Sequence, residues 1–227
     1  MGAVFVTATG TDIGKTFVTA GLIRHLRSAG RSVAALKPVM SGYDPAAAAD
    51  SDAGALLRAL GWPVDAGEIA RIAPWRYRAP LSPDMAAARE GQTLDVDALI
   101  AFSRAAIGAA PDAVLIEGVG GVMVPLDGTR TVRDWMAVLG IPLLLVTGSY
   151  LGTLSHTLTA LDALASAGLQ VRAVAVSESA GSTVALDETV ATLRRFAGNI
   201  PVIALPRLAD PAAAHPAFAQ IAAALGL

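Results

Sequence analysis

The sequence predicts a single doubly wound α/β domain, in which helices flank a mainly parallel sheet. Short β-branched runs alternate with longer Ala- and Leu-rich segments, as in folds whose strands are joined by crossover helices. The short runs are apolar throughout rather than alternating, as expected for strands buried on both faces. Hydrophobic residues make up 54% of the 227 residues and charged residues 16%, so the chain can fill a large core.

Six short runs are predicted to be strands: AVFVTA (3–8), SVAALK (32–37), AVLIEG (113–118), PLLLVTG (142–148), RAVAVS (172–177) and PVIALP (201–206). The amphipathic segments between them are predicted to be helices, at residues 15–29, 53–60, 96–109, 153–167 and 186–197. Residues 38–50 and 61–92 contain more Gly, Pro and Asp, and we expect them to form loops over the carboxyl ends of the strands, where ligands bind. Without a repeat or a linker, we expect one domain over residues 1–227.

The first strand leads into TATGTDIGKT (7–16), which resembles a phosphate-binding loop. The usual pattern is G-x-x-x-x-G-K-[ST], and here Thr9 stands where its first glycine belongs. The context nevertheless fits, because a buried strand precedes the loop and a strong helix pattern follows it. Backbone N–H groups of residues 12–16 would face an anion at the start of the helix. Lys15 would lie along the phosphates and the Thr16 hydroxyl would bind Mg²⁺, which predicts a P-loop NTPase-like domain.

The second and third strands each end in a charged residue. Lys37 ends SVAALK and begins KPVMSG, and Glu117 ends an apolar run before a glycine-rich turn. Carboxyl ends of neighbouring parallel strands border one ligand crevice, so both side chains could face the phosphate loop. A solvated strand-end lysine is the alternative for Lys37. Asp52 is a second candidate metal ligand, or else the cap of the helix that begins with AGALLRAL.

Composition argues against several classes of protein. The net charge is −2 and no cluster of Lys and Arg occurs, so we expect neither a nucleic-acid surface nor a basic membrane anchor. The absence of cysteine excludes disulfides, thiolate metal sites and cysteine nucleophiles. No apolar run reaches the ~18–20 residues that span a bilayer. We therefore expect a soluble cytoplasmic protein.

Several motifs together resemble the dethiobiotin synthetase family over nearly the whole chain. The family loop is similar to G-T-x-T-x-x-G-K-T, which corresponds here to ATGTDIGKT, so the loop is a functional variant whose register starts one residue earlier and in which Ala8 replaces glycine. The other matching motifs are KPV-x-SG at 37–42, SDA at 51–53, SP within LSPDMAA at 81–87, EG-x-GG at 117–121, Pro125-Leu126 and LGTLSHT at 151–157. KPV-x-SG together with EG-x-GG at these spacings is a specific combination.

The resemblance implies a reaction. Such enzymes close a cyclic urea on diaminopelargonic acid, using CO₂ (or bicarbonate) and ATP with Mg²⁺, to give dethiobiotin, ADP and phosphate. One amine takes up CO₂ as a carbamate, whose oxygen attacks the γ-phosphate. The other amine then closes the ring on the mixed anhydride. The resemblance also implies a homodimer whose substrate sites are shared between subunits.

The resemblance assigns roles to named residues. Catalytic groups would be Lys37, Lys15 and Thr11, and the metal ligands would be Thr16, Asp52 and Glu117. Ser41 would contact the substrate, and its distant carboxylate would bind a helix start of the second subunit, formed by Gly152, Thr153, Leu154 and Ser155. His156 matches a family histidine, and we expect it to be buried and hydrogen-bonded. The nucleotide would contact Asp12, Ile13, Gly14, Lys15, Thr16, Phe17, Glu117, Gly118, Val119, Gly120, Ser177, Glu178 and Pro206.

Two departures and two rival functions remain open at the level of sequence. Ser177-Glu178 stands where the family usually has an asparagine for the adenine edge, and serine offers a single donor, so base selectivity is undetermined. Asp84 stands where a histidine often follows Ser-Pro. The main rival is a partitioning or positioning ATPase, a dimeric switch with a similar loop but with a basic or amphipathic surface. A second rival is the synthetase half of a glutamine-dependent amidotransferase, which would need a glutaminase domain with a nucleophilic cysteine, and this chain has no cysteine.

Overall fold

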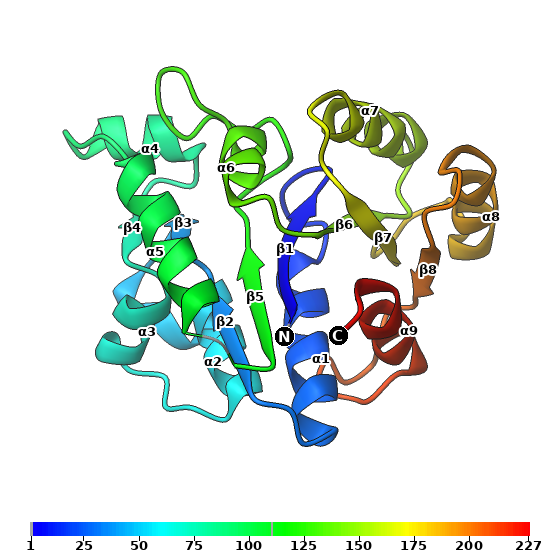
Figure 1. Cartoon of the computed structure of the whole chain (residues 1–227), viewed down its shortest axis with the longest axis horizontal. Coiled ribbons are helices and arrows are strands. Elements are labelled where there is room, and N and C mark those ends of the chain that lie inside the picture. Colours follow the sequence, from blue (N-terminus) through cyan, green and yellow to red (C-terminus); the bar gives the residue numbers. More distant parts are fainter. Residues whose placement is uncertain (1, 110) are drawn as a thin grey trace.

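The structure is a computed structural model that describes residues 2–109 and 111–227. In it the six predicted strands form one parallel sheet (Figure 1). Their order across the sheet is β2-β5-β1-β6-β7-β8. The strands are β1 (Gly2–Ala8), β2 (Val33–Leu36), β5 (Ala113–Glu117), β6 (Leu143–Gly148), β7 (Val171–Ser177) and β8 (Val202–Leu205). The central strand β1 pairs with β5 on one side and β6 on the other. The predicted doubly wound α/β class is confirmed.

Helices cover both faces of this sheet (Figure 1). On one face α1 (Lys15–Ser28) packs against α2 (Asp52–Leu60) and α9 (Pro216–Leu225). The other face carries α5 (Val96–Gly108), α6 (Val132–Leu139), α7 (Thr153–Ser166) and α8 (Leu186–Phe196). The five predicted helices are therefore present, and α6 and α9 complete the two layers.

The expectation that residues 38–50 and 61–92 form irregular loops is wrong for much of their length. They contain a 3-10 helix at Pro45–Asp50, the helices α3 (Ala66–Ile72) and α4 (Pro83–Arg89), and the strands β3 (Val39–Ser41) and β4 (Trp75–Tyr77). The two strands form a separate parallel pair. A polar side chain starts α3, where the Asp65 carboxylate accepts from Glu68 N, and a proline, Pro83, opens α4. Elements of three to seven residues are too short to give a periodic signal.

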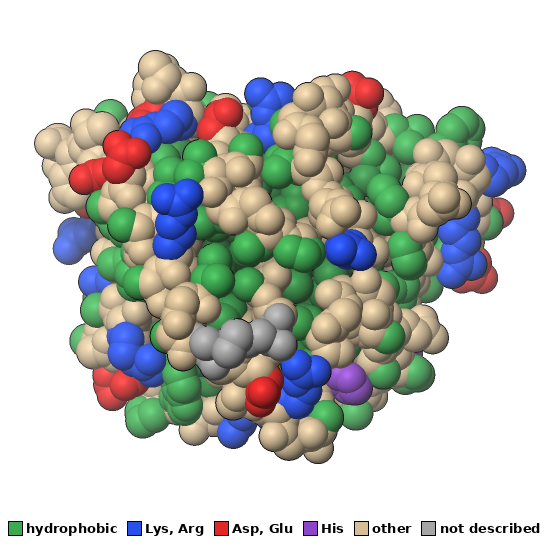
Figure 2. All heavy atoms as spheres, viewed as in Figure 1, with side chains coloured by type: hydrophobic (Ala, Val, Ile, Leu, Met, Phe, Trp, Pro, Cys, Tyr) green, Lys and Arg blue, Asp and Glu red, His purple; other side chains and the backbone are tan. Residues whose placement is uncertain are grey.

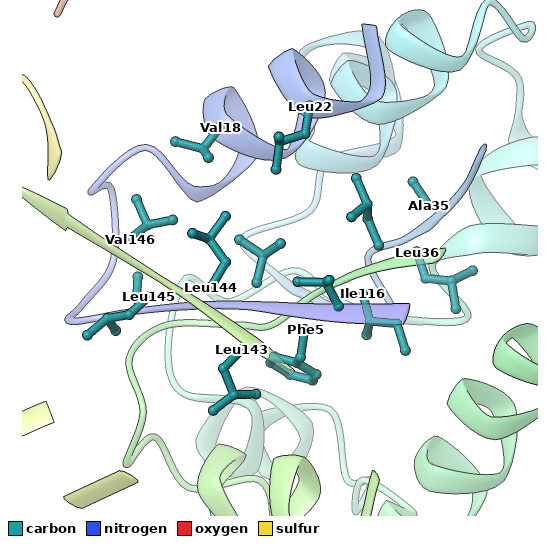
Figure 3. Close-up of a cluster of buried hydrophobic side chains, with 14 of the residues drawn as sticks. Phe5, Val18, Leu22, Ala35, Leu36, Ile116, Leu143, Leu144, Leu145 and Val146 are labelled. Atoms are coloured by element: carbon teal, nitrogen blue, oxygen red, sulfur yellow. The ribbon is translucent and has the colours of Figure 1, made fainter. Parts of the chain in front are cut away.

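Side chains from the sheet and α1 fill the core next to the phosphate loop (Figure 3). Val18 and Leu22 of α1 face Leu144 and Val146 of β6, and all four are fully buried. Phe5 points to the opposite face, where its ring meets the edge of Trp135 at 4.6 Å between centroids. Burying each large apolar side chain contributes ~1.5–3 kcal/mol. This packing holds the end of β1 and the start of α1 in place.

Figure 2 views one face of the molecule. Lys and Arg side chains lie scattered over this face rather than in a single patch, and hydrophobic side chains occupy much of its centre. Among the described residues, no helix is both long enough and apolar enough to cross a membrane.

Candidate active site

The phosphate loop spans residues 9–14, between β1 and α1. Gly14 precedes α1 with φ 97°, and Asp12 has φ 57°. Both lie in the left-handed region, which aspartate tolerates better than most residues and glycine adopts freely. A Cβ at Gly14 would also lie 2.8 Å from the Ser177 Oγ. The glycine of Gly-Lys-Thr is therefore needed both for its backbone angle and for the close approach of β7.

Lys15 lies across this loop and is buried. Its Nζ donates to the carbonyl oxygens of Gly10 and Gly120, each at 2.9 Å. Burial, and then the positive charge of Lys37, lower the pKa of Lys15 to about 8. The ammonium thus bridges the phosphate loop and the glycine-rich turn after β5 without a direct carboxylate partner of its own.

Strand register brings Lys37 and Glu117 together. Leu36 of β2 pairs with Ile116 of β5, so the next residue of each strand lies side by side at the carboxyl edge. Lys37 Nζ lies 2.7 Å from Glu117 Oε1 and 2.9 Å from Asp52 Oδ2, and it donates to Gly118 O at 2.9 Å. Lys37 is 3% exposed, which excludes the solvated alternative.

The ionisation of Lys37 and Asp52 depends on the balance between burial and the charges beside them. Burial alone would lower the pKa of Lys37, but Glu117 and Asp52 outweigh it, and the net pKa is raised. Burial would raise the pKa of Asp52, but Lys37 lowers it below the usual value. Both groups are therefore ionised at neutral pH, as an ion pair.

Asp52 is the first residue of α2 and not its cap. The cap is Ser51, whose Oγ accepts from Gly54 N at 3.1 Å. This leaves the Asp52 carboxylate free to contact Thr16 and Lys37. Of the two alternatives for Asp52, the structure supports a side chain that belongs to the site.

Thr16, Asp52 and Glu117 provide a set of oxygen donors that fits Mg²⁺. Thr16 Oγ1 lies 2.8 Å from Asp52 Oδ1 and 2.6 Å from Glu117 Oε1, although its hydroxyl has a single proton to donate. Glu117 Oε2 is buried and has no hydrogen-bond partner among the described residues. Mg²⁺ prefers such hard oxygens and commonly takes only one or two carboxylates, with phosphates and water completing its shell. The described part of the chain has no cluster of three or more His, Cys, Asp or Glu suited to a metal, so phosphate oxygens would be needed.

A cavity of about 750 Å³ lies over this cluster. Predicted residues that line it are Thr11, Asp12, Gly14, Lys15, Thr16, Lys37, Ser41, Asp52, Val119 and Gly120. Ser41 Oγ is buried and makes no hydrogen bond to any described residue, so its donor and acceptor are available to a ligand. The apolar part of the remaining wall comes from β3 and the residues after it, the segment around α4, and the turn after β5, with Met40, Tyr43, Pro80, Leu81, Pro83 and Val124. Its polar part includes Asp50, Ser51 and Ser82.

A second cavity of about 480 Å³ adjoins the other side of the phosphate loop. Asp12 and Gly14 line both cavities, so the loop separates them. Four residues predicted to contact the nucleotide, Ile13, Phe17, Ser177 and Glu178, line the second one, together with Ser179, Ala180, Arg207, Leu208 and Pro211. Pro206 precedes these last residues but is not part of the lining.

The predicted carboxylate site at the start of α7 lies outside both cavities: none of Gly152, Thr153, Leu154 and Ser155 lines either one. Thr153 is buried, and its hydroxyl donates to Gly148 O at 2.7 Å. Its backbone N–H donates to Tyr150 O at 3.0 Å, so both donors of Thr153 already have partners.

His156, in the first turns of α7, differs from its prediction. Its Nδ1 is hydrogen-bonded to Tyr150 OH at 2.8 Å, as expected, but the side chain is exposed. The expectation that it is buried is wrong, because His156 lies on the outer face of α7, whereas Thr153 and Thr157 face the sheet.

Comparison with known proteins places the chain in a family. An AAA domain family matches residues 2–213. The ATP-dependent dethiobiotin synthetase BioD of Acidiphilium cryptum (strain JF-5) is 52% identical, over 88% of this chain and 91% of its own length. The chain belongs to the dethiobiotin synthetase family. The family members of Phenylobacterium zucineum and Caulobacter sp. (strain K31) are 49% and 50% identical, each over 91% of this chain and 89% of their own lengths.

Solved structures resemble this dethiobiotin synthetase family member in fold alone. The signal recognition particle receptor FtsY of Elizabethkingia anophelis superposes with a TM-score of 0.54 at 15% identity, covering 99% of this chain and 65% of that one. The MinC:MinD complex of Aquifex aeolicus gives a TM-score of 0.56 at 13% identity, covering 92% and 82%. These neighbours support the predicted P-loop NTPase-like fold.

Some site residues of this dethiobiotin synthetase homologue could not be read from its sequence motifs. Ser179, Ala180, Arg207, Leu208 and Pro211 lie in the segments after β7 and β8. Their one sequence signal is position, since they follow predicted parallel strands and so lie at the carboxyl edge of the sheet.

Proposed function

We propose that this chain catalyses the ATP-dependent synthesis of dethiobiotin from diaminopelargonic acid and CO₂, a ring-closing step of biotin biosynthesis. Family membership supports an ATP-dependent ligase. The observation that carries the finer proposal is the cavity that Lys15, Lys37 and Ser41 line together, with Thr16 and Asp52 on the same wall. It combines a phosphate site with room and polar groups for an amine substrate. We propose a single domain over residues 1–227, and we place the reaction in the cytoplasm, where its co-substrate ATP is made.

ATP would bind along the phosphate loop. The N–H groups at the start of α1 and the Lys15 ammonium would hold its phosphates, and its base would enter the cavity lined by Phe17, Ser177 and Glu178. Thr16, Asp52 and Glu117 would hold Mg²⁺, which when bound supplies positive charge to the β- and γ-phosphate oxygens.

The residues over the cavity suit the proposed chemistry. One substrate amine attacks CO₂ and loses a proton to form a carbamate, and a carbamate oxygen then attacks the γ-phosphorus as ADP leaves. The second amine attacks the carbonyl carbon of this mixed anhydride, phosphate leaves, and the nitrogen loses a proton. Carbamate and triphosphate repel each other, so the charges of Lys37 and Lys15 stabilise the approach. Ser41 and Thr11 would orient the carbamate or amine by hydrogen bonds.

The remote carboxylate of the substrate would bind the start of α7 in a second subunit. Free N–H groups at a helix start and the helix dipole both favour an anion. Because Gly152–Ser155 line neither cavity of their own chain, a homodimer would bring them to the neighbour's substrate.

Mass spectrometry tests the proposal. Diaminopelargonic acid, bicarbonate and ATP with Mg²⁺ should give dethiobiotin, and phosphate should be released only when the diamine is present. Lys37→Ala should still bind ATP while losing turnover by on the order of 10²–10³. Phosphate release without diamine and without product would instead indicate a switch ATPase.

A further inference from the structure

Four threonine hydroxyls connect the phosphate loop to the first turns of α7. Thr147, near the end of β6, is at the centre of this group. Its Oγ1 lies 3.2 Å from that of Thr9, the first residue of the loop, and 2.9 Å and 2.8 Å from those of Thr153 and Thr157 in α7. Thr147, Thr153 and Thr157 are at most 1% exposed. Hydrogen bonds between hydroxyls this deeply buried rigidify the groups that they join.

Counting protons gives the group a direction. Thr153 donates its hydroxyl proton to Gly148 O, and Thr157 donates its own to Thr153 O, each at 2.7 Å. Toward Thr147 both can only accept. Either hydroxyl of the Thr9–Thr147 pair can be the donor. The most hydrogen bonds form when Thr9 donates to Thr147 and Thr147 gives its one proton to one of the two α7 acceptors. The group thus has two arrangements, which differ in the α7 residue that Thr147 holds.

We propose that Thr147 is a positioning residue that couples nucleotide binding at the phosphate loop to carboxylate binding at the start of α7. The inference rests on the proposed function, in which that helix start serves the substrate of the partner subunit. Phosphate binding fixes the loop and with it the Thr9 hydroxyl. A Thr9 hydroxyl held in one position fixes the direction of the Thr147 hydroxyl, and with it the α7 residue to which Thr147 donates. ATP in one subunit therefore raises the affinity of the neighbouring site for diaminopelargonic acid, and by linkage the substrate raises the affinity for ATP.

Thr147 can be separated from direct contacts because it lines neither cavity. Direct attraction or repulsion between ATP and the diamine does not pass through its hydroxyl. Replacing that hydroxyl by a methyl group of similar size removes the connection and leaves both ligand sites intact. Thr189, equally buried in α8, gives a matched control, since its hydroxyl donates to Ala185 O outside this group.

The test measures the Kd of diaminopelargonic acid by calorimetry, in the absence of bicarbonate. The coupling factor is the Kd without the β,γ-imido analogue of ATP divided by the Kd with it. The wild-type factor should be at least about fivefold. Thr147→Val should reduce it at least about threefold relative to wild type, while Thr147→Ser and Thr189→Val should preserve it. If Thr147→Val does not fold, Thr9→Val becomes the test variant, and it should lower the coupling factor relative to wild type.

A Thr147→Val protein with the wild-type factor would overturn the proposal, as would a wild-type factor of one in an enzyme that makes dethiobiotin. Those outcomes leave the proposed function standing. If the wild-type protein neither binds nor converts the diamine, the proposed function itself is wrong.

Discussion

Lys15 and Lys37 line the same cavity, yet their surroundings shift their pKa values in opposite directions. Lys15 contacts two neutral carbonyl oxygens, and burial lowers its pKa to about 8. Lys37 contacts two carboxylates, which raise its pKa in spite of burial. Lys15 is therefore the group whose protonation an incoming phosphate can change near neutral pH, whereas Lys37 keeps its proton throughout.

Nucleotide binding should consequently take up a proton at alkaline pH. Above pH 8 most free protein lacks the Lys15 proton, and a bound phosphate raises the pKa of Lys15 so that the proton returns. Proton uptake should grow between pH 7 and 9, and affinity should fall by up to about tenfold per pH unit above 8. Calorimetry in buffers of different ionisation enthalpy measures both. Uptake that is absent at pH 9 would contradict this account of Lys15.

Glu117→Gln should weaken Mg²⁺-dependent activity. The amide keeps the size of the carboxylate but loses the charge that a hard cation prefers, so half-maximal activity should require more Mg²⁺, and added Mg²⁺ should partly restore the rate. The measurement is a Mg²⁺ titration of initial rate. Asp50, an acidic residue that lines the same cavity, is the control, and Asp50→Asn should leave the titration unchanged. An unchanged curve for Glu117→Gln would assign Glu117 to the Lys37 ion pair alone.

At the scale of elements, α1 and α9 approach each other closely through Gly21. A methyl group at this position would overlap the ring of Phe218, which also stacks edge-on against Phe17, a lining residue of the nucleotide cavity. The glycine is thus required by packing although it lies in the middle of a helix. The contact joins the last helix of the chain to the helix that begins with the phosphate-binding Lys15.

Gly21→Ala should therefore destabilise the fold. Alanine gains ~1 kcal/mol in helix propensity over glycine, but overpacking a tight core typically costs ~1–3 kcal/mol, so the free energy of unfolding should fall. No described residue outside the backbone of α5 lies within 4 Å of a Cβ added at Gly108, and Gly108→Ala should leave stability unchanged or raise it by up to ~1 kcal/mol. Denaturant unfolding compares the two. If both substitutions change the free energy of unfolding equally, the Phe218 ring moves aside at little cost and the packing argument is wrong.

Element length explains what the sequence could predict. The strands and long helices carry a clear apolar pattern over many residues, and the motifs of the site, Lys15, Thr16, Lys37 and Glu117, lie directly at their ends. β3, β4, α3 and α4 are too short for a period to emerge. Ser179 and Arg207 were missed for another reason: their distance from the phosphate loop depends on the order of strands in the sheet, which no local pattern specifies.

At the scale of the whole molecule, the proposed substrate site is divided between two copies of the chain. Leu151, just before the α7 helix start, is 84% exposed, and a large apolar side chain this exposed is compatible with contact to a partner. Gly152 has φ 97° and so accepts side chains poorly. Ser155 is exposed in the first turn, where an acidic residue suits the helix dipole. A charge can thus be added there without disturbing the fold.

Mixing two inactive variants should restore activity if the sites are shared. Ser155→Asp repels the substrate carboxylate, and Lys37→Ala removes the catalytic charge. A hybrid dimer has one site with both defects and one with neither, so an equal mixture after subunit exchange should reach about a quarter of wild-type activity for a two-fold dimer. A dead mixture with exchange confirmed by native mass spectrometry, or a fully active wild-type monomer, would contradict the shared site.

The position of β1 in the middle of the sheet also bears on how the protein reaches its native state. Gly2 pairs with Ala113 and Phe5 with Leu143, so β1 finds both partners only after β5 and β6 have left the ribosome. Pairings so distant in sequence are slow to form, and an apolar strand that waits for them is exposed to association with other chains. The phosphate loop between β1 and α1, although encoded among the first residues, would be among the last parts to acquire its working shape. Nucleotide binding would then report on completed synthesis of the central sheet.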